Sequence, residues 1–203
     1  SRFICLSSTR RYTRFPCESS RAVIEGEAAV EASGLDWTIM RPSMIYGDVR
    51  DNNLQRIVEW FHRRRWFPLV RGGQQLVQPV FVEDVAKVVV DSIDLPRAIH
   101  RSYTLAGPEA FPFKSMIEQV AQMAGVRAVF VPLPYAGALV ASAAIETMFK
   151  KPIVTTEQVN RFLENKDFDI GTSRTDLGFH PISFAEGLEK KRQMLILPRD
   201  FAQ

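Results

Sequence analysis

The chain has 203 residues, of which 46% are hydrophobic and 24% are charged, and this composition is typical of a globular protein rather than a disordered one. Its formal net charge of +3 does not by itself indicate nucleic-acid binding, and its basic residues form no recognition motif. The two cysteines, Cys5 and Cys17, are too few for a disulfide framework, so we expect a reducing, cytoplasmic location. The three histidines show no ligand spacing, so no metal site is expected.

The first part of the chain alternates between strand-like and helix-like segments. Residues 2–7 are an apolar run that predicts a strand buried on both faces, as in a parallel sheet. A helix is expected over 19–33, because Gly34 follows it as a stop signal. Residues 38–41 predict the next strand, and the spacing of apolar residues over 53–65 predicts a second helix.

The rest of the chain continues the alternation. Strands are expected over 67–70, 76–82, 102–106 and 126–131, and helices over 83–93, 112–124, 136–149, 155–163 and 183–197. This order predicts an α/β fold: a partial Rossmann-like parallel sheet, containing the later strands only, with a smaller mixed α/β C-terminal lobe. The longest apolar stretch, 129–145, contains two prolines and is shorter than the roughly 20 residues of a spanning helix, so no transmembrane segment is expected.

No G-x-G-x-x-G motif stands anywhere in the sequence. A dinucleotide-binding fold carries this turn after its first strand, where the pyrophosphate meets a helix N-terminus. Because the turn is absent and the first residue is Ser1 rather than Met, we expect the chain to be the C-terminal part of such a fold. Loss of the early strands would leave the edge of the first strand unpaired, which predicts self-association across that edge or through helices.

Several segments carry a resemblance to a known superfamily. They are Leu6-Ser7-Ser8-Thr9, Glu25-Gly26-Glu27 with residues 32–39, Arg41-Pro42-Ser43-Met44-Ile45-Tyr46-Gly47, and Gly72-Gly73 with residues 78–86. Together they resemble the short-chain dehydrogenase/reductase superfamily in its extended and atypical branches, which include nucleotide-sugar epimerases and dehydratases and regulators of the NmrA type. Residues 103–109, 131–134 and 155–159 favour the branch that is similar to an accessory subunit of respiratory complex I.

The resemblance implies a cofactor, a substrate class and a domain division. The cofactor would be NAD or NADP, bound weakly or not at all by these residues alone, because the pyrophosphate contacts belong to the missing half. Residues 1–47 would be the C-terminal part of an NAD(P)-binding Rossmann-like domain, and residues 48–203 a substrate lobe with returning Rossmann elements. The partner would be a small molecule such as a nucleotide sugar or a quinone-like compound.

The resemblance also assigns candidate site residues. The expected cofactor contacts are Ser7, Ser8, Arg41, Pro42, Ser43, Met44 and Ile45, the catalytic candidates are Thr9 and Tyr12, and the substrate-contact candidates are Asn53 and Gln78. Simpler interpretations stay open beside these assignments. The hydroxyls at 7–9 would satisfy backbone groups at a strand end, and Asn53 and Asp84 would cap helices.

The superfamily's acid–base pair does not match this sequence. Active members carry a Tyr that transfers a proton at the substrate and a Lys four residues later whose charge lowers the pKa of that Tyr. Those positions fall here on Ser19 and Val23, and neither side chain can do this chemistry. Two functions therefore remain: an NAD(P)-dependent epimerase, dehydratase or reductase that uses Tyr12 or a water, and a non-catalytic NAD(P)-binding sensor or assembly component.

Overall fold

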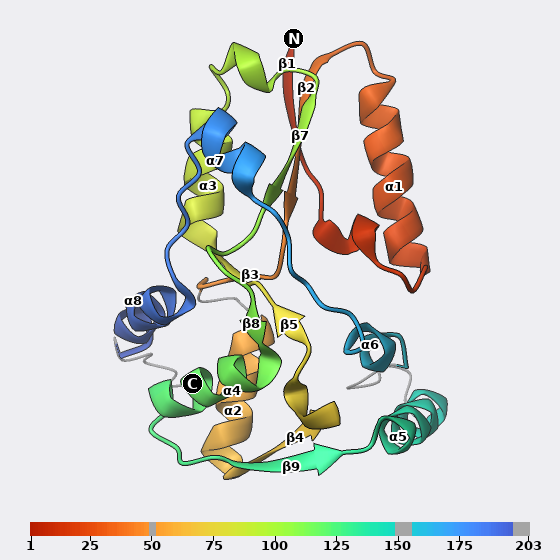
Figure 1. Ribbon diagram of the computed structural model, residues 1–203, viewed down its shortest axis with the longest axis vertical. Coiled ribbons are helices and arrows are strands. Elements are labelled where there is room, and N and C mark those ends of the chain that lie inside the picture. The colour runs from red at the N-terminus through yellow and green to blue at the C-terminus, as the bar shows by residue number, and fades with distance from the viewer. Residues whose placement is uncertain (49–51, 149–155, 197–203) are drawn as a thin grey trace, which may run out of the picture.

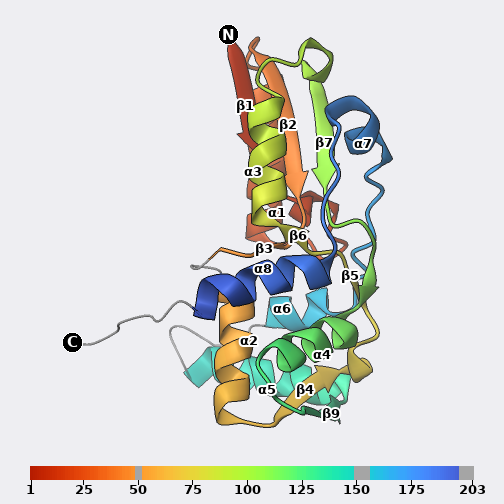
Figure 2. The same ribbon diagram turned by 90° about the vertical axis from the view of Figure 1, so that its left-hand side faces the viewer.

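A computed structural model describes residues 1–48, 52–148 and 156–196 (Figure 1). Its main sheet has three parallel strands in the order β1 (Arg2–Leu6), β2 (Asp36–Pro42) and β7 (Arg101–Leu105). Figures 1 and 2 place helices α1 (Glu18–Glu31) and α3 (Val82–Asp91) on opposite faces of this sheet. This layered arrangement is the expected one, because a parallel sheet must bury both of its faces.

The other end of the molecule consists mainly of helices around short strands (Figure 2). Its elements are α2 (Asn52–Arg63), β4 (Trp66–Val70), α4 (Phe113–Met123), β9 (Val129–Leu133), α5 (Tyr135–Met148), α6 (Thr156–Arg161) and α8 (Phe184–Ile196). Strands β4 and β9 pair in parallel, and α5 packs against α6. A hydrophobic cluster that includes Leu54, Phe61, Ile117 and Phe184 joins α2, α4 and α8.

Short elements complete the structure. They are the 3-10 turns η1 (Thr9–Tyr12), η2 (Arg71–Gly73) and η3 (Pro96–Ala98), the strands β3 (Ile45–Tyr46), β5 (Leu76–Val77), β6 (Val80–Phe81) and β8 (Phe111–Pro112), and the helix α7 (Gly171–Leu177). Strand β3 pairs with β6 in parallel, and β5 pairs with β8 in antiparallel fashion. Strand β7, which follows residue 48 in the chain, lies in the first sheet beside β2. The division of the chain into two domains stays a prediction.

The α/β class and the parallel sheet expected from the sequence are confirmed, with local differences. Residues 76–82, expected as one strand, form the two short strands β5 and β6, and α3 already begins at Val82. Strand β9 begins at Val129 rather than at residue 126. Helix α7 was not predicted, because its sequence is polar and has no apolar periodicity. Strand β1 is not buried on both faces, since the side chains of Phe3 and Leu6 are 40% and 55% exposed. The reason is that β2 is the only neighbour of β1 among the described residues.

One capping assignment is wrong. Asp84 does not cap α3, whose N-cap residue is Phe81. Its carboxylate instead accepts a hydrogen bond from the backbone N–H of Ile182 at 2.9 Å, and so ties α3 to the segment that precedes α8. Burial raises the pKa of the Asp84 carboxyl above its usual value. Within the residues that the structure describes, no helix is long and apolar enough to cross a bilayer.

Candidate ligand-binding site

A cavity of about 780 Å³ lies at the carboxyl ends of β1 and β2. Its walls are three segments: residues 7–10 and 12–15 after β1, residues 42–45 after β2, and residues 161, 163–166 and 168 after α6. The carboxyl ends of parallel strands are where open α/β sheets bind ligands, because the loops there diverge and leave a crevice. Its volume falls in the range of small-molecule sites, roughly 300–1,000 Å³.

Most of the site residues expected from the sequence meet in this cavity. Those that line it are Ser7, Ser8, Thr9, Tyr12, Pro42, Ser43, Met44 and Ile45. Their hydroxyls also serve the local backbone, because Ser8 Oγ accepts from the N–H of Arg10 at 3.1 Å and Thr9 Oγ1 donates to the carbonyl of Pro42 at 3.3 Å. Ser8 and Thr9 therefore do satisfy backbone groups near the strand ends, and they also line the cavity wall.

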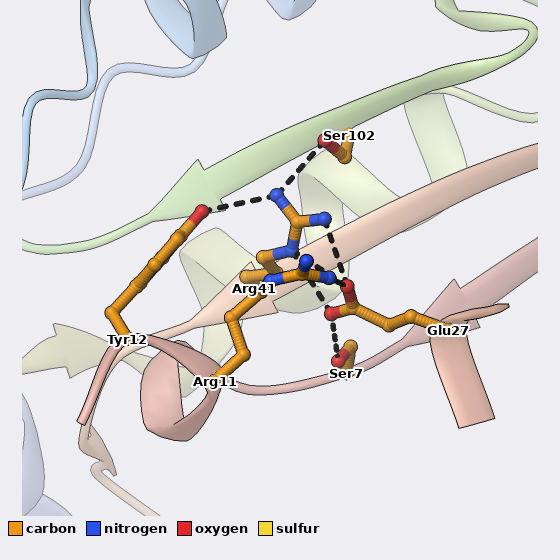
Figure 3. Close-up of polar contacts among 6 residues, drawn as sticks. All are labelled: Ser7, Arg11, Tyr12, Glu27, Arg41 and Ser102. Carbon is orange, nitrogen blue, oxygen red and sulfur yellow. Dashed lines mark hydrogen bonds and ion pairs between the residues drawn. The ribbon is translucent and has the colours of Figure 1, made fainter. Parts of the chain in front are cut away.

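Arg41 lies behind the cavity wall instead of lining it. Its side chain is largely buried and ion-paired with the carboxylate of Glu27, with Nη2 at 2.8 Å from Oε2 (Figure 3). Its Nη1 atom donates to Tyr12 Oη at 3.0 Å and to Ser102 Oγ at 2.9 Å. The guanidinium thus connects α1, η1 and β7, and its contact with Tyr12 holds that phenol at the cavity.

Glu27 was not among the residues expected at the site. It is 1% exposed, and besides Arg41 it is bound by Arg11 and accepts a hydrogen bond from Ser7 Oγ at 2.5 Å (Figure 3). A signal for it does exist in the sequence. An arginine in the middle of an apolar strand needs a buried carboxylate partner, because charged groups are almost never buried unpaired.

The Tyr12 hydroxyl is arranged as a hydrogen-bond donor toward the cavity. Its oxygen accepts from Arg41, its side chain is 47% exposed, and no acceptor for its own proton is found among the described residues. A phenol has one proton to donate, so that proton is available to a carbonyl or hydroxyl oxygen of a ligand. Ser19 and Val23, which the resemblance aligned with the superfamily's acid–base positions, lie on α1 and do not line the cavity.

Gln78 stands outside the cavity, in contrast to Tyr12. It is 4% exposed, and its Nε2 atom donates to the carbonyls of Gly107 at 2.8 Å and Phe168 at 3.2 Å. Its Oε1 atom accepts from the N–H of Phe168 at 2.6 Å. Gln78 therefore fixes Phe168, which lines the cavity. The other substrate-contact candidate, Asn53, lies in the first turn of α2, and its side chain falls outside the described residues.

Four basic residues in the cavity wall were also not expected from the sequence. They are Arg10, Arg14, Arg161 and Lys166, and the one acidic residue of the wall is Glu164. The Glu164 carboxylate accepts from Thr13 Oγ1 at 2.8 Å and from the backbone N–H of Arg14. Burial, with the nearby charge of Arg161, lowers the pKa of Lys166 to about 8. Burial, with the charge of Arg10, also lowers the pKa of Arg161.

Lys166→Met is expected to stabilise the protein at pH 7 by roughly 1–3 kcal/mol. The pKa of Lys166 is about 8 in the folded chain, against an ordinary value of 10.5, so burial of the charged amine disfavours folding. That penalty is complete below pH 8 and disappears as the pH rises to 10.5. Urea unfolding of the wild type and of Lys166→Met at pH 7 and pH 9.5 measures this penalty. Lys87→Met, at a solvent-exposed position, is the control. An equal difference in stability at both pH values would contradict this expectation.

No group of three or more His, Cys, Asp or Glu residues that could hold a metal ion occurs among the residues described.

No family model matches the chain. The chain is 31% identical over 137 residues to the mouse (Mus musculus) protein "NADH dehydrogenase [ubiquinone] 1 alpha subcomplex subunit 9, mitochondrial", and this match covers 66% of the chain and 34% of the mouse protein. The chain thus spans about a third of the length of that relative.

Solved structures show the same fold. The UDP-glucuronic acid 4-epimerase of Bacillus cereus, in complex with UDP-glucuronic acid and NAD, superposes with a TM-score of 0.68 at 16% identity, covering 95% of this chain and 60% of that one. A short-chain dehydrogenase/reductase superfamily protein from Agrobacterium tumefaciens with bound NAD gives a TM-score of 0.63 at 16% identity, covering 96% of this chain and 68% of that one. The chain is therefore homologous over part of its length to the NADH dehydrogenase subunit, and it shares its fold with the solved epimerase and short-chain dehydrogenase/reductase structures.

Proposed function

We propose that the cavity binds the nicotinamide end of NAD or NADP and that the protein holds this cofactor without turning it over. The observation that carries the proposal is the make-up of the walls: the turns after β1 and β2 form the cavity, while the acid–base positions hold Ser19 and Val23 and lie outside it. Homology to a protein named as an NADH dehydrogenase subunit supports a structural or sensing role in an assembly.

A titration with reduced nicotinamide compounds tests this proposal. The 203 residues contain no glycine-rich turn to bind a pyrophosphate. We therefore expect the chain to bind reduced nicotinamide riboside, which has no phosphate and does not need such a turn. Nicotinamide fluorescence reports binding, and absorbance at 340 nm reports any oxidation. Absence of riboside binding at millimolar concentration, or steady oxidation of bound NADH, would contradict the proposal.

The second candidate function is catalysis of an epimerase, dehydratase or reductase type. The observation in its favour is Tyr12, whose hydroxyl reaches the cavity and accepts a hydrogen bond from a cationic guanidinium at 3.0 Å. If a nucleotide sugar or a quinone-like compound is turned over, Tyr12→Phe should lower kcat by about 100-fold or more, the typical contribution of a general acid. A Tyr12→Phe variant with unchanged kcat would exclude the phenol as the proton donor.

Self-association is proposed for the free edge of β1. Phe3 and Leu6 are exposed there, beside backbone groups for which the described residues provide no strand partner. Phe3→Lys should shift a dimer or larger species toward monomer in analytical ultracentrifugation, because a charge opposes edge pairing. Val140→Lys, on the exposed face of α5, is the matched control. A wild-type chain that is monomeric at high concentration would contradict the expectation. The cytoplasmic location also stays a prediction, and the mouse relative is named as mitochondrial.

A further inference from the structure

Three cations from separate parts of the chain converge on the cavity. Arg10 lies on η1 after the first strand, Arg161 ends α6, and Lys166 follows in the segment that runs along β5. They are close enough to affect one another, since Arg10 and Arg161 both contribute to the lowered pKa of Lys166. All three side chains are half-buried rather than extended into water.

These cations have few direct partners in the protein, although the negative charge of Glu164 partly offsets the lowered pKa of Arg161 and of Lys166. Within the described part of the chain, no hydrogen bond or ion pair engages the side chain of Arg10 or Lys166, and Arg161 has only Glu157 at 3.9 Å. The carboxylate of Glu164 lies in the same wall, but it is held by Thr13 and by the backbone of Arg14. Partly desolvated like charges repel each other, so the cluster costs stability unless an anion sits among its members.

We propose that Arg10, Arg161 and Lys166 bind a phosphate or carboxylate group of a small molecule held in this cavity. Guanidinium groups fit both anions through paired hydrogen bonds, and an ammonium adds a point charge. At about 780 Å³ the cavity is far larger than one such group, so the anion is one end of a larger molecule. That molecule extends toward Tyr12, which lines the same cavity.

The backbone around Lys166 supports a built site. Its own N–H donates to the carbonyl of Leu76 at 2.9 Å, and Asn165 Oδ1 accepts from the N–H of Leu76 at 3.0 Å. These bonds hold residues 165–166 against β5, so the backbone of Lys166 has a fixed position in the cavity wall. An anion bound there would connect η1, the turn that follows β1, to the segment that follows α6. The inference rests on the proposed function only in taking this cavity as the ligand site.

Calorimetric titration at pH 7 and constant ionic strength tests the site, with pyrophosphate, inorganic phosphate and malonate as probes. We expect at least one probe to bind, and Lys166→Met and Arg161→Gln each to weaken that binding about tenfold, the typical effect of losing a charge-assisted contact. Lys87→Met removes the same charge far from the cavity and should change affinity less than twofold. Tighter binding of the phosphates identifies a phosphoester ligand, and tighter binding of malonate identifies a carboxylate.

Further variants and outcomes test whether the anion site exists. Lys166→Arg should retain binding, and Arg10→Gln should lose it, which keeps the test open if one variant folds poorly. Equal binding by wild type, Lys166→Met and Lys87→Met, or heats that follow ionic strength alone, would overturn the proposal. Pyrophosphate binding without nicotinamide riboside binding would refute the proposed cofactor site and leave the anion site standing. Riboside binding without specific anion binding would refute the anion site and leave the proposed cofactor site standing.

Discussion

Glu27→Gln is expected to lower the free energy of unfolding by about 3–5 kcal/mol, the range for breaking one side of a buried ion pair. The carboxylate is 1% exposed and compensates Arg41, which is itself largely buried. With a neutral amide at position 27, the guanidinium keeps its charge in a largely buried site, and Arg11 also loses its partner. Urea unfolding followed by circular dichroism measures the change.

Two controls separate this effect from general damage to α1. Glu25→Gln changes the same chemistry at an exposed position of the same helix and should cost less than about 0.5 kcal/mol. The double variant Glu27→Met with Arg41→Met removes both charges, and it should recover much of the stability, because a buried ion pair can be replaced by apolar side chains at little cost. A Glu27→Gln protein as stable as Glu25→Gln would show that the ion pair contributes little.

Gln78→Ala is expected to cost about 2–4 kcal/mol and to weaken ligand binding in the cavity. The variant leaves the N–H and carbonyl of Phe168 and the carbonyl of Gly107 without their partner, and each unsatisfied buried group costs about 1–3 kcal/mol. Phe168 lines the cavity and would no longer be fixed, so the wall after α6 would loosen. Urea unfolding gives the first effect, and titration with pyrophosphate gives the second.

The same variant distinguishes two roles of Gln78. A substrate contact, as the sequence suggested, would weaken binding and leave stability unchanged, whereas a structural hydrogen-bonding role changes both. Gln122→Ala, at an exposed position of α4, is the matched control and should alter neither. A Gln78→Ala protein with wild-type stability would contradict the structural role.

Local sequence patterns were sufficient to predict much of the fold. The alternation of apolar strands and helices, with glycine stops such as Gly34, places α1, β2, α2, α4 and α8 within a few residues of their observed bounds. These patterns are readable because helix and strand formation depend on neighbours in the sequence. The superfamily resemblance also assigned the turns after β1 and β2 to one site. Both turns line the cavity, because the ends of adjacent parallel strands lie together.

The features that the sequence did not reveal depend on contacts between distant residues. Arg10 and Arg161 are about 150 positions apart, and nothing near either residue indicates that they share a cavity with Lys166. The sequence analysis treated Gln78 as a substrate-contact candidate. Its hydrogen-bond partner, Phe168, lies 90 positions away and comes into reach only after folding. The sequence by itself therefore determined most of the elements, and its resemblance to the superfamily predicted the absence of the Tyr/Lys pair. The tertiary structure decided which charges are paired, as in Glu27 and Arg41, and which face the cavity, because long-range packing sets burial and electrostatic environment.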